Sequence, residues 1–186
     1  TLQGEYGVLT IEKDGQYSYV PNGTGYGLEV FEYTLHSPMG NSSEAILTIN
    51  VAKDFVGSQY NDVITSTAGN DTFTSGAGAD TVIYSVLAGA ESDSRGGNGH
   101  DIWKDFSLSE GDKIDVSALL VGFDKDSSDI GDYVSVRQEG EHAIVTLDRD
   151  GSVDDKTYER VDLITLEKTN AQTLLLDELL KYNSEI

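Results

Sequence analysis

A nine-residue period governs the middle of the chain. Between residues 57 and 104, a loop of small residues leads to Asp at the sixth place and an apolar residue at the eighth. Three units follow one another directly (57–65, 66–74 and 75–83), and a fourth covers 96–104. The sixth places hold Asp62, Asp71, Asp80 and Asp101, and the eighth places hold Ile64, Phe73, Val82 and Trp103. A fixed period of this kind predicts a coiled ribbon in which each unit stacks on others and buries its apolar residue between them.

The spacing also predicts which loops meet. Six residues make a turn and three make a short strand, so eighteen residues complete one coil and loop 57–62 stacks on loop 75–80. Two carboxylates about 5 Å apart repel by roughly 3 kcal/mol at an effective dielectric near 20. A calcium ion between them converts this repulsion into ligation, because calcium takes six to eight oxygens and small residues let backbone carbonyls reach inward. We therefore expect calcium between stacked loops.

The interruption after the third unit fits the same scheme. Asp101 lies thirty residues after Asp71, which is one coil of eighteen plus twelve. If 84–95 is an inserted loop, loop 96–101 stacks on loop 66–71. Within the insertion Asp93 could add a ligand, although solvation is favoured. The loops depart from an all-glycine pattern at Tyr60, Ser66 and Ser75, which backbone ligation tolerates better than loss of an Asp.

These repeats resemble the calcium-binding nonapeptides of the RTX family of secreted bacterial proteins, which implies a calcium-binding parallel β-roll. The segment 105–120 resembles the "DF…GDxIDLS" motif that closes such rolls. This likeness makes Asp105 and Asp112 candidates for a terminal calcium site, while capping and turn roles explain them equally well. Asp115 is expected to cap a short helix or turn starting at Ser117. The candidate calcium ligands are Ser58, Tyr60, Asp62, Thr67, Gly69, Asp71, Ser75, Ala77, Asp80, Gly96, Asn98, Asp101, Asp105 and Asp112.

The charge balance narrows the choice of partners. The chain carries 33 acidic and 12 basic residues, for a net charge of −21. This excludes nucleic acid and argues against anionic membrane surfaces, whereas clustered Asp residues suit a cation. There is no cysteine, as in a protein exported without disulfides, and no apolar run long enough for a transmembrane helix. The first residues do not form a signal peptide and read as the middle of a longer chain.

Residues 1–52 predict four β-strands. Segments 6–13 and 16–20 flank Asp14-Gly15, a hairpin signal, and 28–36 and 44–51 form two more strands. The phrases 7–19, 31–35 and 45–51 resemble the later half of the Ig-like repeats of large bacterial adhesins. An Ig-like domain needs about seven strands, so the resemblance implies a partial domain. Hairpins without any adhesin history are the alternative.

The remainder predicts a closing region. Segments 133–138 and 142–148 read as a hairpin around Glu139-Gly140, and 160–166 as a further strand. The acidic run 148–155 looks like an EF-hand loop, but Val153 occupies the place of its glycine, which favours a polar β-turn. Thr169 to Ile186 predicts an amphipathic helix, with a Thr169/Gln172 capping box and one apolar face made of Leu175, Leu176, Leu179 and Leu180.

The sequence thus predicts an all-β protein: a short calcium-binding β-roll with additional antiparallel strands and a C-terminal helix, preceded by Ig-like strands. The expected domains are a partial Ig-like unit (1–53) and a β-roll with a secretion and capping region (54–186), joined by a linker at 52–56. The resemblance implies a non-catalytic extracellular module of a cell-surface adhesin active in attachment or biofilm. It also implies type I export by an ABC exporter that reads the C-terminal segment, with surface ligands bound through other domains.

Two other functions remain open at this point. Many RTX proteins are proteases or lipases, and an upstream catalytic domain would make this segment an enzyme tail. The chain itself has neither His-Glu-x-x-His nor Gly-x-Ser-x-Gly, and its histidines (His36, His100 and His142) are isolated. A calcium-dependent ligand-binding tip is the second alternative, for which Tyr60, Tyr84 and Trp103 are the nearby aromatic residues, with Trp103 expected in the core.

Overall fold

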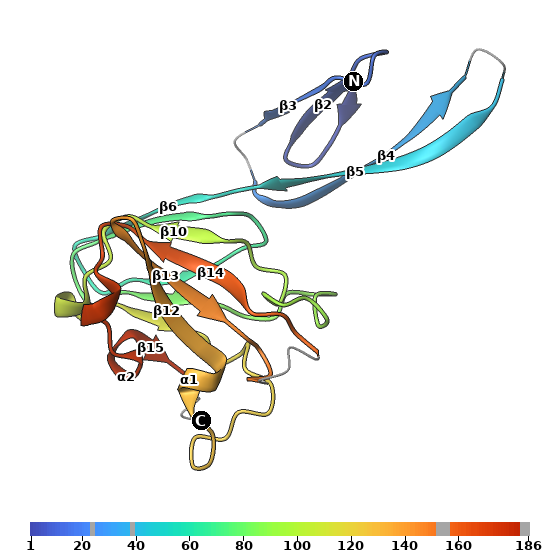
Figure 1. Cartoon of the computed structure of the whole chain (residues 1–186). Helices are drawn as coiled ribbons and strands as arrows, with labels where there is room; N and C mark the ends of the chain where they lie inside the picture. The colour runs from blue at the N-terminus through green and yellow to red at the C-terminus, as the bar shows by residue number, and fades with distance from the viewer. Residues whose placement is uncertain (23–24, 38–39, 152–156, 183–186) are drawn as a thin grey trace.

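Two parallel sheets face each other and make the roll (Figure 1). The computed structural model describes residues 1–22, 25–37, 40–151 and 157–182. The chain alternates between the sheets, as the nine-residue period predicts. One sheet holds β7 (Val63–Thr65), β9 (Thr81–Ile83), β11 (Lys113–Asp115) and β15 (Leu180–Lys181). The parallel part of the other holds β6 (Asp54–Ser58), β8 (Thr72–Gly76), β10 (Asp101–Trp103) and β14 (Val161–Leu166).

Strand register confirms the predicted coil. Ile64 of β7 pairs with Val82 of β9, eighteen residues later. Across the insertion, Trp103 of β10 pairs with Phe73 of β8. The segment 84–95 is an irregular loop, so its twelve residues leave the phase of the ribbon unchanged.

An antiparallel hairpin widens one sheet. Strands β12 (Val134–Glu139) and β13 (His142–Leu147) form the predicted hairpin, and β13 pairs with β14, giving the order β12-β13-β14-β10-β8-β6. A one-turn helix α1 (Ile130–Tyr133) precedes β12, and its N-cap Asp129 accepts from the N–H of Gly131. In the acidic run the described part, 148–151, is a turn closed by Gly151 N–H to Asp148 O, while 152–156 lie outside the described residues.

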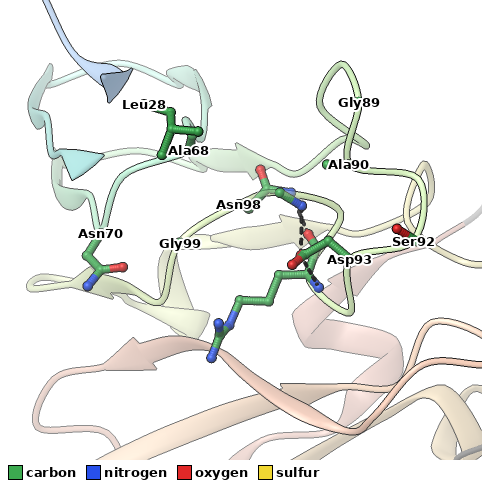
Figure 2. A pocket seen from close by; sticks show the side chains of 11 residues that line it. Leu28, Ala68, Asn70, Gly89, Ala90, Ser92, Asp93, Asn98 and Gly99 are labelled. Carbon is green, nitrogen blue, oxygen red and sulfur yellow. Dashed lines mark hydrogen bonds between the residues drawn. The ribbon is translucent and has the colours of Figure 1, made fainter. Parts of the chain in front are cut away.

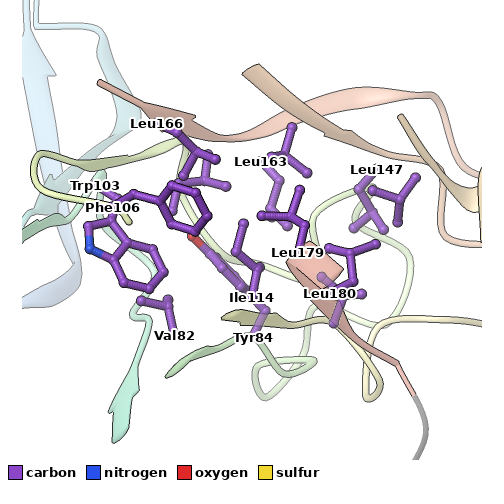
Figure 3. Close-up of a cluster of buried hydrophobic side chains, with 14 of the residues drawn as sticks. Val82, Tyr84, Trp103, Phe106, Ile114, Leu147, Leu163, Leu166, Leu179 and Leu180 are labelled. Carbon is purple, nitrogen blue, oxygen red and sulfur yellow. The ribbon is translucent and has the colours of Figure 1, made fainter. Parts of the chain in front are cut away.

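The apolar core runs along the inside of the roll and continues under the hairpin (Figure 3). The four eighth-place side chains are buried as predicted, with Phe73, Val82 and Trp103 at 0% exposure and Ile64 at 7%. Trp103 stacks edge-on with Phe106. Burial of large apolar side chains contributes about 1.5–3 kcal/mol each. The core is completed on the hairpin side by Leu147, Leu163, Leu166, Leu179 and Leu180.

The amino-terminal strands form two further sheets. One contains β1 (Leu2–Gln3), β2 (Gly7–Ile11) and β3 (Tyr17–Pro21); the other pairs β4 (Gly27–His36) with β5 (Ser42–Val51). This agrees with the expected hairpins and adds β1, which is too short to show a pattern. Tyr19 of β3 packs edge-on against the buried ring of Phe31 of β4, and its hydroxyl donates to Glu29, so the two sheets are in contact. Lys53 lies over the rings of Tyr26 and Phe55, at the entry to the roll.

Three expectations need correction. The segment 52–56 is not a linker, because β6 already starts at Asp54. Strands β6 and β8 have five residues instead of three, so the sheet extends to Ser58 and Gly76. The C-terminal helix is a single turn, as described next.

The C-terminal amphipathic segment divides into three pieces. A 3₁₀ turn η2 (Ala171–Thr173) is followed by helix α2 (Leu176–Leu179) and strand β15. The cap of η2 is Asn170, which accepts from Gln172 N–H, and not Thr169. Leu175 is 61% exposed, so the four leucines do not share one buried face. The pairing of β15 with β11 ends the helix, because its backbone groups are used in the sheet. Residues 183–186 lie outside the described part.

Candidate metal centre in the stacked loops

The sixth-place aspartates form a ladder between coils. The N–H of Asp62 donates to Asp80 Oδ1 at 2.8 Å, and that of Asp80 donates to Asp112 Oδ1 at 2.9 Å. On the other side of the roll, the N–H of Asp71 donates to Asp101 Oδ1 at 2.8 Å. The predicted stacking of 57–62 on 75–80 and of 66–71 on 96–101 is therefore confirmed. We call 57–62, 75–80 and 107–112 the first loop stack, and 66–71 with 96–101 the second.

Two sixth places were not recognised in the sequence. Asp112 follows Ser107 by five residues and precedes buried Ile114 by two, so 107–115 is a further unit of the ribbon. Lys53 holds the equivalent place before the first repeat, and its N–H donates to Asp71 Oδ1 at 2.8 Å. The sequence signal that could have identified these two units is the apolar eighth-place residue, Phe55 after Lys53 and Ile114 after Asp112. These two units were missed because their loops lack the glycine-rich pattern of the other repeats.

Asparagine and glycine keep successive loops in contact. Asn61 Oδ1 accepts from Ala79 N–H, and Asn70 Oδ1 accepts from His100 N–H, both at 3.0 Å. A Cβ on Gly76 would lie 1.8 Å from Ser58 O, and the φ of Gly76 is +96°. Only glycine combines this backbone conformation with such a close approach. The small residues of the repeat are therefore required by loop stacking.

The first loop stack offers a carboxylate oxygen that the protein leaves uncompensated. Asp80 is fully buried, and its Oδ2 has no hydrogen-bond partner among the described residues. The ion pairs between described residues do not include Asp62, Asp80 or Asp112. A buried ionised carboxylate without donors is strongly disfavoured, and a hard cation satisfies it. The donor set of this stack therefore fits calcium.

A cation here has to take most of its oxygens from the backbone. Within the described part of the chain, no group of three or more acidic or histidine side chains could hold a metal. Calcium accepts carbonyl oxygens, and the candidate loop residues bring carbonyls to the stack. In the first loop stack Ser58 O already accepts the N–H of Ala77, and in the second Gly96 O accepts that of Leu87. Of the other candidates, Tyr60, Ser75 and Ala77 lie in the first loop stack, and Thr67 and Gly69 lie in the second.

The second loop stack is satisfied differently. Asp101 Oδ2 accepts from Ser66 Oγ at 2.8 Å and from Tyr84 Oη at 2.7 Å. Thr67 donates to Asp71 through its N–H, at 2.7 Å, and through its Oγ1, at 2.9 Å. Burial raises the pKa of Asp101 to about 7, against the lowering effect of these hydrogen bonds, and burial beside Asp101 raises the pKa of Tyr84 well above its usual value.

The closing motif ties its carboxylates to backbone N–H groups. Asp105 accepts from Ser75 and Gly76 N–H, each at 2.9 Å, and thereby caps the end of β8. Asp112 accepts from Ser107 N–H at 2.8 Å in addition to Asp80, and burial raises its pKa to about 6. Both residues reach the first loop stack. Asp115 accepts from the N–H and Oγ of Ser117, as expected of a turn cap.

A polar cleft lies beside the second stack (Figure 2). The insertion lines it with Asp93, whose Oδ1 accepts from the N–H groups of Arg95 and Gly97 and so caps its own loop. Asn98 donates to Ser85 O and Arg95 O, while its buried Oδ1 has no partner among the described residues. Of the aromatics considered for ligand binding, Tyr84 and Trp103 are fully buried and Tyr60 is 70% exposed.

This fold and these stacked acidic loops define the class: a calcium-binding β-roll. Residues 55–84 match the family described as RTX calcium-binding nonapeptide repeat (4 copies). Calcium is the cation that such repeats bind, and proteins that carry them are generally secreted. No curated protein matches the chain in a sequence comparison.

Three solved structures are among those similar to this chain. The AlgE6R3 subunit of the Azotobacter vinelandii mannuronan C5-epimerase is 23% identical, with a TM-score of 0.36, covering 73% of this chain and 80% of its own. The C-terminal domain (RV) of MpAFP is 20% identical, with a TM-score of 0.36, covering 60% and 74%. The extracellular lipase LipA from Serratia marcescens is 13% identical, with a TM-score of 0.34, covering 94% of this chain and 29% of its own.

Proposed function

We propose that this chain is the calcium-folded RTX module of a secreted cell-surface adhesin, exported unfolded and active in attachment or biofilm formation. The observation that carries the calcium part is Asp80, a fully buried carboxylate with an oxygen that lacks any described donor. It lies in a ladder of carboxylates within a chain of net charge −21. Among the candidate ligands named from the sequence, the charged members of this site are the aspartates of the first loop stack, Asp62, Asp80 and Asp112.

Calcium stabilises the folded state here by offsetting the electrostatic repulsion between its carboxylates. Where free calcium is scarce, the carboxylates of neighbouring coils repel and the buried ones lose their hydration. Extracellular calcium modules bind with dissociation constants of about 10⁻⁴ to 10⁻³ M, so occupancy follows export. Because the loops come together only in the folded chain, binding energy adds to folding energy.

The adhesin and export parts rest on different support. The amino-terminal strands pair as two hairpin-containing sheets, in keeping with the likeness of their sequence to adhesin repeats. The C-terminal segment supplies α2 and β15, whose Leu179 and Leu180 are buried in the roll. An exporter can therefore read this segment only before the chain folds. No helix in the described residues is long and apolar enough to cross a membrane.

The described contacts of the histidines favour a non-catalytic module. His100 Nε2 bonds with Thr165 Oγ1 at 2.9 Å, and His142 Nδ1 accepts from Lys168 N–H at 3.1 Å. His36 ends β4 opposite Ser42. These contacts between described residues give none of the three histidines a carboxylate partner that would orient it as a general base.

Circular dichroism with and without calcium tests the proposal. The chain should lack most β signal in excess chelator at neutral pH and gain it on adding millimolar calcium, with burial of Trp103 reported by its fluorescence. Magnesium at the same concentration serves as the control and should not restore the fold, because it keeps its waters and demands octahedral geometry. A full β spectrum in chelator at neutral pH would refute calcium-coupled folding.

Export is tested separately. Co-expressed with a type I exporter, the chain should accumulate in the medium, and removal of 169–186 should leave it inside the cell. If the truncated chain leaves the cell as well as the full one, the C-terminal segment is not the export signal, whatever the calcium result.

A further inference from the structure

The two loop stacks differ at one buried carboxylate in each, Asp80 in the first and Asp101 in the second, while Asp62 accepts from Ser58 much as Asp71 accepts from Thr67. In the first stack Asp80 Oδ1 accepts from the N–H of Asp62, while Oδ2 faces no donor among the described residues. Asp62 and Asp112 lie in the coils on either side. Three carboxylates thus follow one another along this stack, and the buried central one is incompletely satisfied.

In the second stack each carboxylate has a full set of protein donors. Asp101 receives three hydrogen bonds, from Asp71 N–H, Ser66 Oγ and Tyr84 Oη. Asp71 also receives three, from Lys53 N–H and from the N–H and Oγ1 of Thr67. Both carboxylates are fully buried. These donors replace part of the hydration that each buried carboxylate loses, so the two side chains are held in the stack by the protein without a metal.

The two hydroxyl groups that donate to Asp101 belong to residues that depart from the glycine-rich repeat. Ser66 stands at the first place of its unit, and Tyr84 stands nine residues after Ser75, at the equivalent place where the insertion begins. Ser66 is 4% and Tyr84 0% exposed, and both hydroxyls reach the same oxygen of Asp101. The phenol ring fills the interior of the roll, so the side chain also occupies space between the coils. The other buried oxygen of this stack that lacks a partner among the described residues, Asn98 Oδ1, is uncharged, so its burial is disfavoured less than that of the Asp80 carboxylate oxygen.

We propose that calcium is bound in the first loop stack, around Asp80, and that the hydroxyl groups of Ser66 and Tyr84 close the second stack at Asp101 without calcium. The inference rests on the proposed calcium function and divides its candidate ligands into two groups. Asp62, Asp80 and Asp112 belong to the metal-binding side. Asp71 and Asp101 belong to a metal-free seam held by protein donors.

The test counts calcium ions on the full chain. Wild type, Asp80→Asn, Asp101→Asn and Tyr84→Phe are equilibrated with calcium, and bound ions per chain are measured by atomic emission after dialysis. Circular dichroism at saturating calcium verifies that each variant is folded. Asp80→Asn should lose at least one ion or bind calcium at least 10-fold more weakly. Asp101→Asn and Tyr84→Phe should bind as many ions as wild type.

Tyr84→Phe provides a second readout if Asp101→Asn does not fold. In saturating calcium, loss of its hydrogen bond to a buried charge should raise the unfolding equilibrium constant by roughly 10-fold, while the calcium midpoint of wild type is retained. Loss or gain of an ion in Tyr84→Phe or Asp101→Asn would overturn the metal-free seam. A wild-type chain that binds no calcium would refute the proposed function itself, before any variant is compared.

Discussion

At the scale of single residues, glycine is where stacking and backbone conformation meet. Gly76 and Gly122 both have positive φ, +96° and +72°, but only Gly76 faces a neighbouring coil. Ser58 O would lie 1.8 Å from a Cβ at 76, whereas a Cβ at 122 meets nothing within 4 Å. The pair therefore separates the cost of left-handed backbone from the cost of lost loop contact.

Gly76→Ala should destabilise the calcium-loaded chain much more than Gly122→Ala. Left-handed backbone costs about 1 kcal/mol at either site, and overpacking against Ser58 O adds about 1–3 kcal/mol at 76. Urea unfolding in saturating calcium measures both values. Equal destabilisation of the two variants would show that loop 75–80 does not stack on 57–62 as described.

The core serine at the first place of the third unit makes a second residue-level prediction. Ser75 is fully buried and its Oγ accepts from Trp103 Nε1 at 3.1 Å. Ser75→Ala leaves the indole N–H without its acceptor, which should cost about 1–3 kcal/mol. Trp103 is the single tryptophan, so its fluorescence reports the change directly in the calcium-loaded chain. Ser109→Ala, at an exposed position, is the control and should unfold at the wild-type urea concentration.

At the scale of elements, the period of the repeat was sufficient to predict strands β7 to β10 and the pairing of β7 with β9 and of β8 with β10. The eighteen-residue return fixes Ile64 against Val82, and the apolar eighth place fixes which face is buried. The hairpin β12–β13 could be predicted because its pattern and turn are local. The hydrogen-bond donors to each carboxylate could not be predicted from spacing alone, since Tyr84, which donates to Asp101, lies at the start of the insertion.

The C-terminal element shows where local pattern misleads. Leucines at 175, 176, 179 and 180 satisfy helical periodicity, yet β15 pairs with β11 and limits the helix to one turn. A strand partner 66 residues away in sequence, Ile114 against Leu180, is invisible to a periodicity argument. Tertiary pairing thus overrides propensity here.

Leucine substitutions distinguish the observed arrangement from a continuous helix. Leu180 is 3% exposed and should cost about 2–5 kcal/mol when changed to alanine, whereas Leu175 is 61% exposed and should cost less than 0.5 kcal/mol, the usual range for surface changes. Thermal and urea unfolding in calcium measure the difference. Similar losses at both positions would favour one amphipathic helix with a shared buried face.

At the scale of the whole molecule, buried carboxylates give the metal-free chain an unusual pH dependence. Burial raises the pKa of Asp101 to about 7 and those of Asp112 and Asp148 to about 6, while an unfolded Asp titrates near 3.9. Between these values the folded chain binds more protons than the unfolded chain. Stability of the metal-free fold is therefore greatest at low pH and is lost as pH rises through about 6 to 7.

We expect the folded fraction of the metal-free chain to increase when the pH is lowered from 7.5 to 5, as measured by circular dichroism. Calcium should stabilise less at pH 5 than at 7.5, because ligation requires deprotonated carboxylates. Asp148→Asn, outside the loop stacks, should weaken the pH dependence of the metal-free chain and leave the gain from calcium unchanged. A metal-free chain that becomes more folded as pH rises would contradict the titration described here.

The position of β14 has a consequence for how such a molecule can change in length. Strand β14 pairs with the edge of β10, and β15 pairs with the edge of β11. The last repeat strand of each sheet is therefore followed by a strand that does not belong to the repeats. At the opposite end β6 and β7 are the outermost strands of their sheets. Whole eighteen-residue coils can consequently be duplicated ahead of β8 without disturbing the pairing of β14 and β15. Gene duplication can thus lengthen this ribbon in one direction, with the final 80 or so residues kept as a constant end piece.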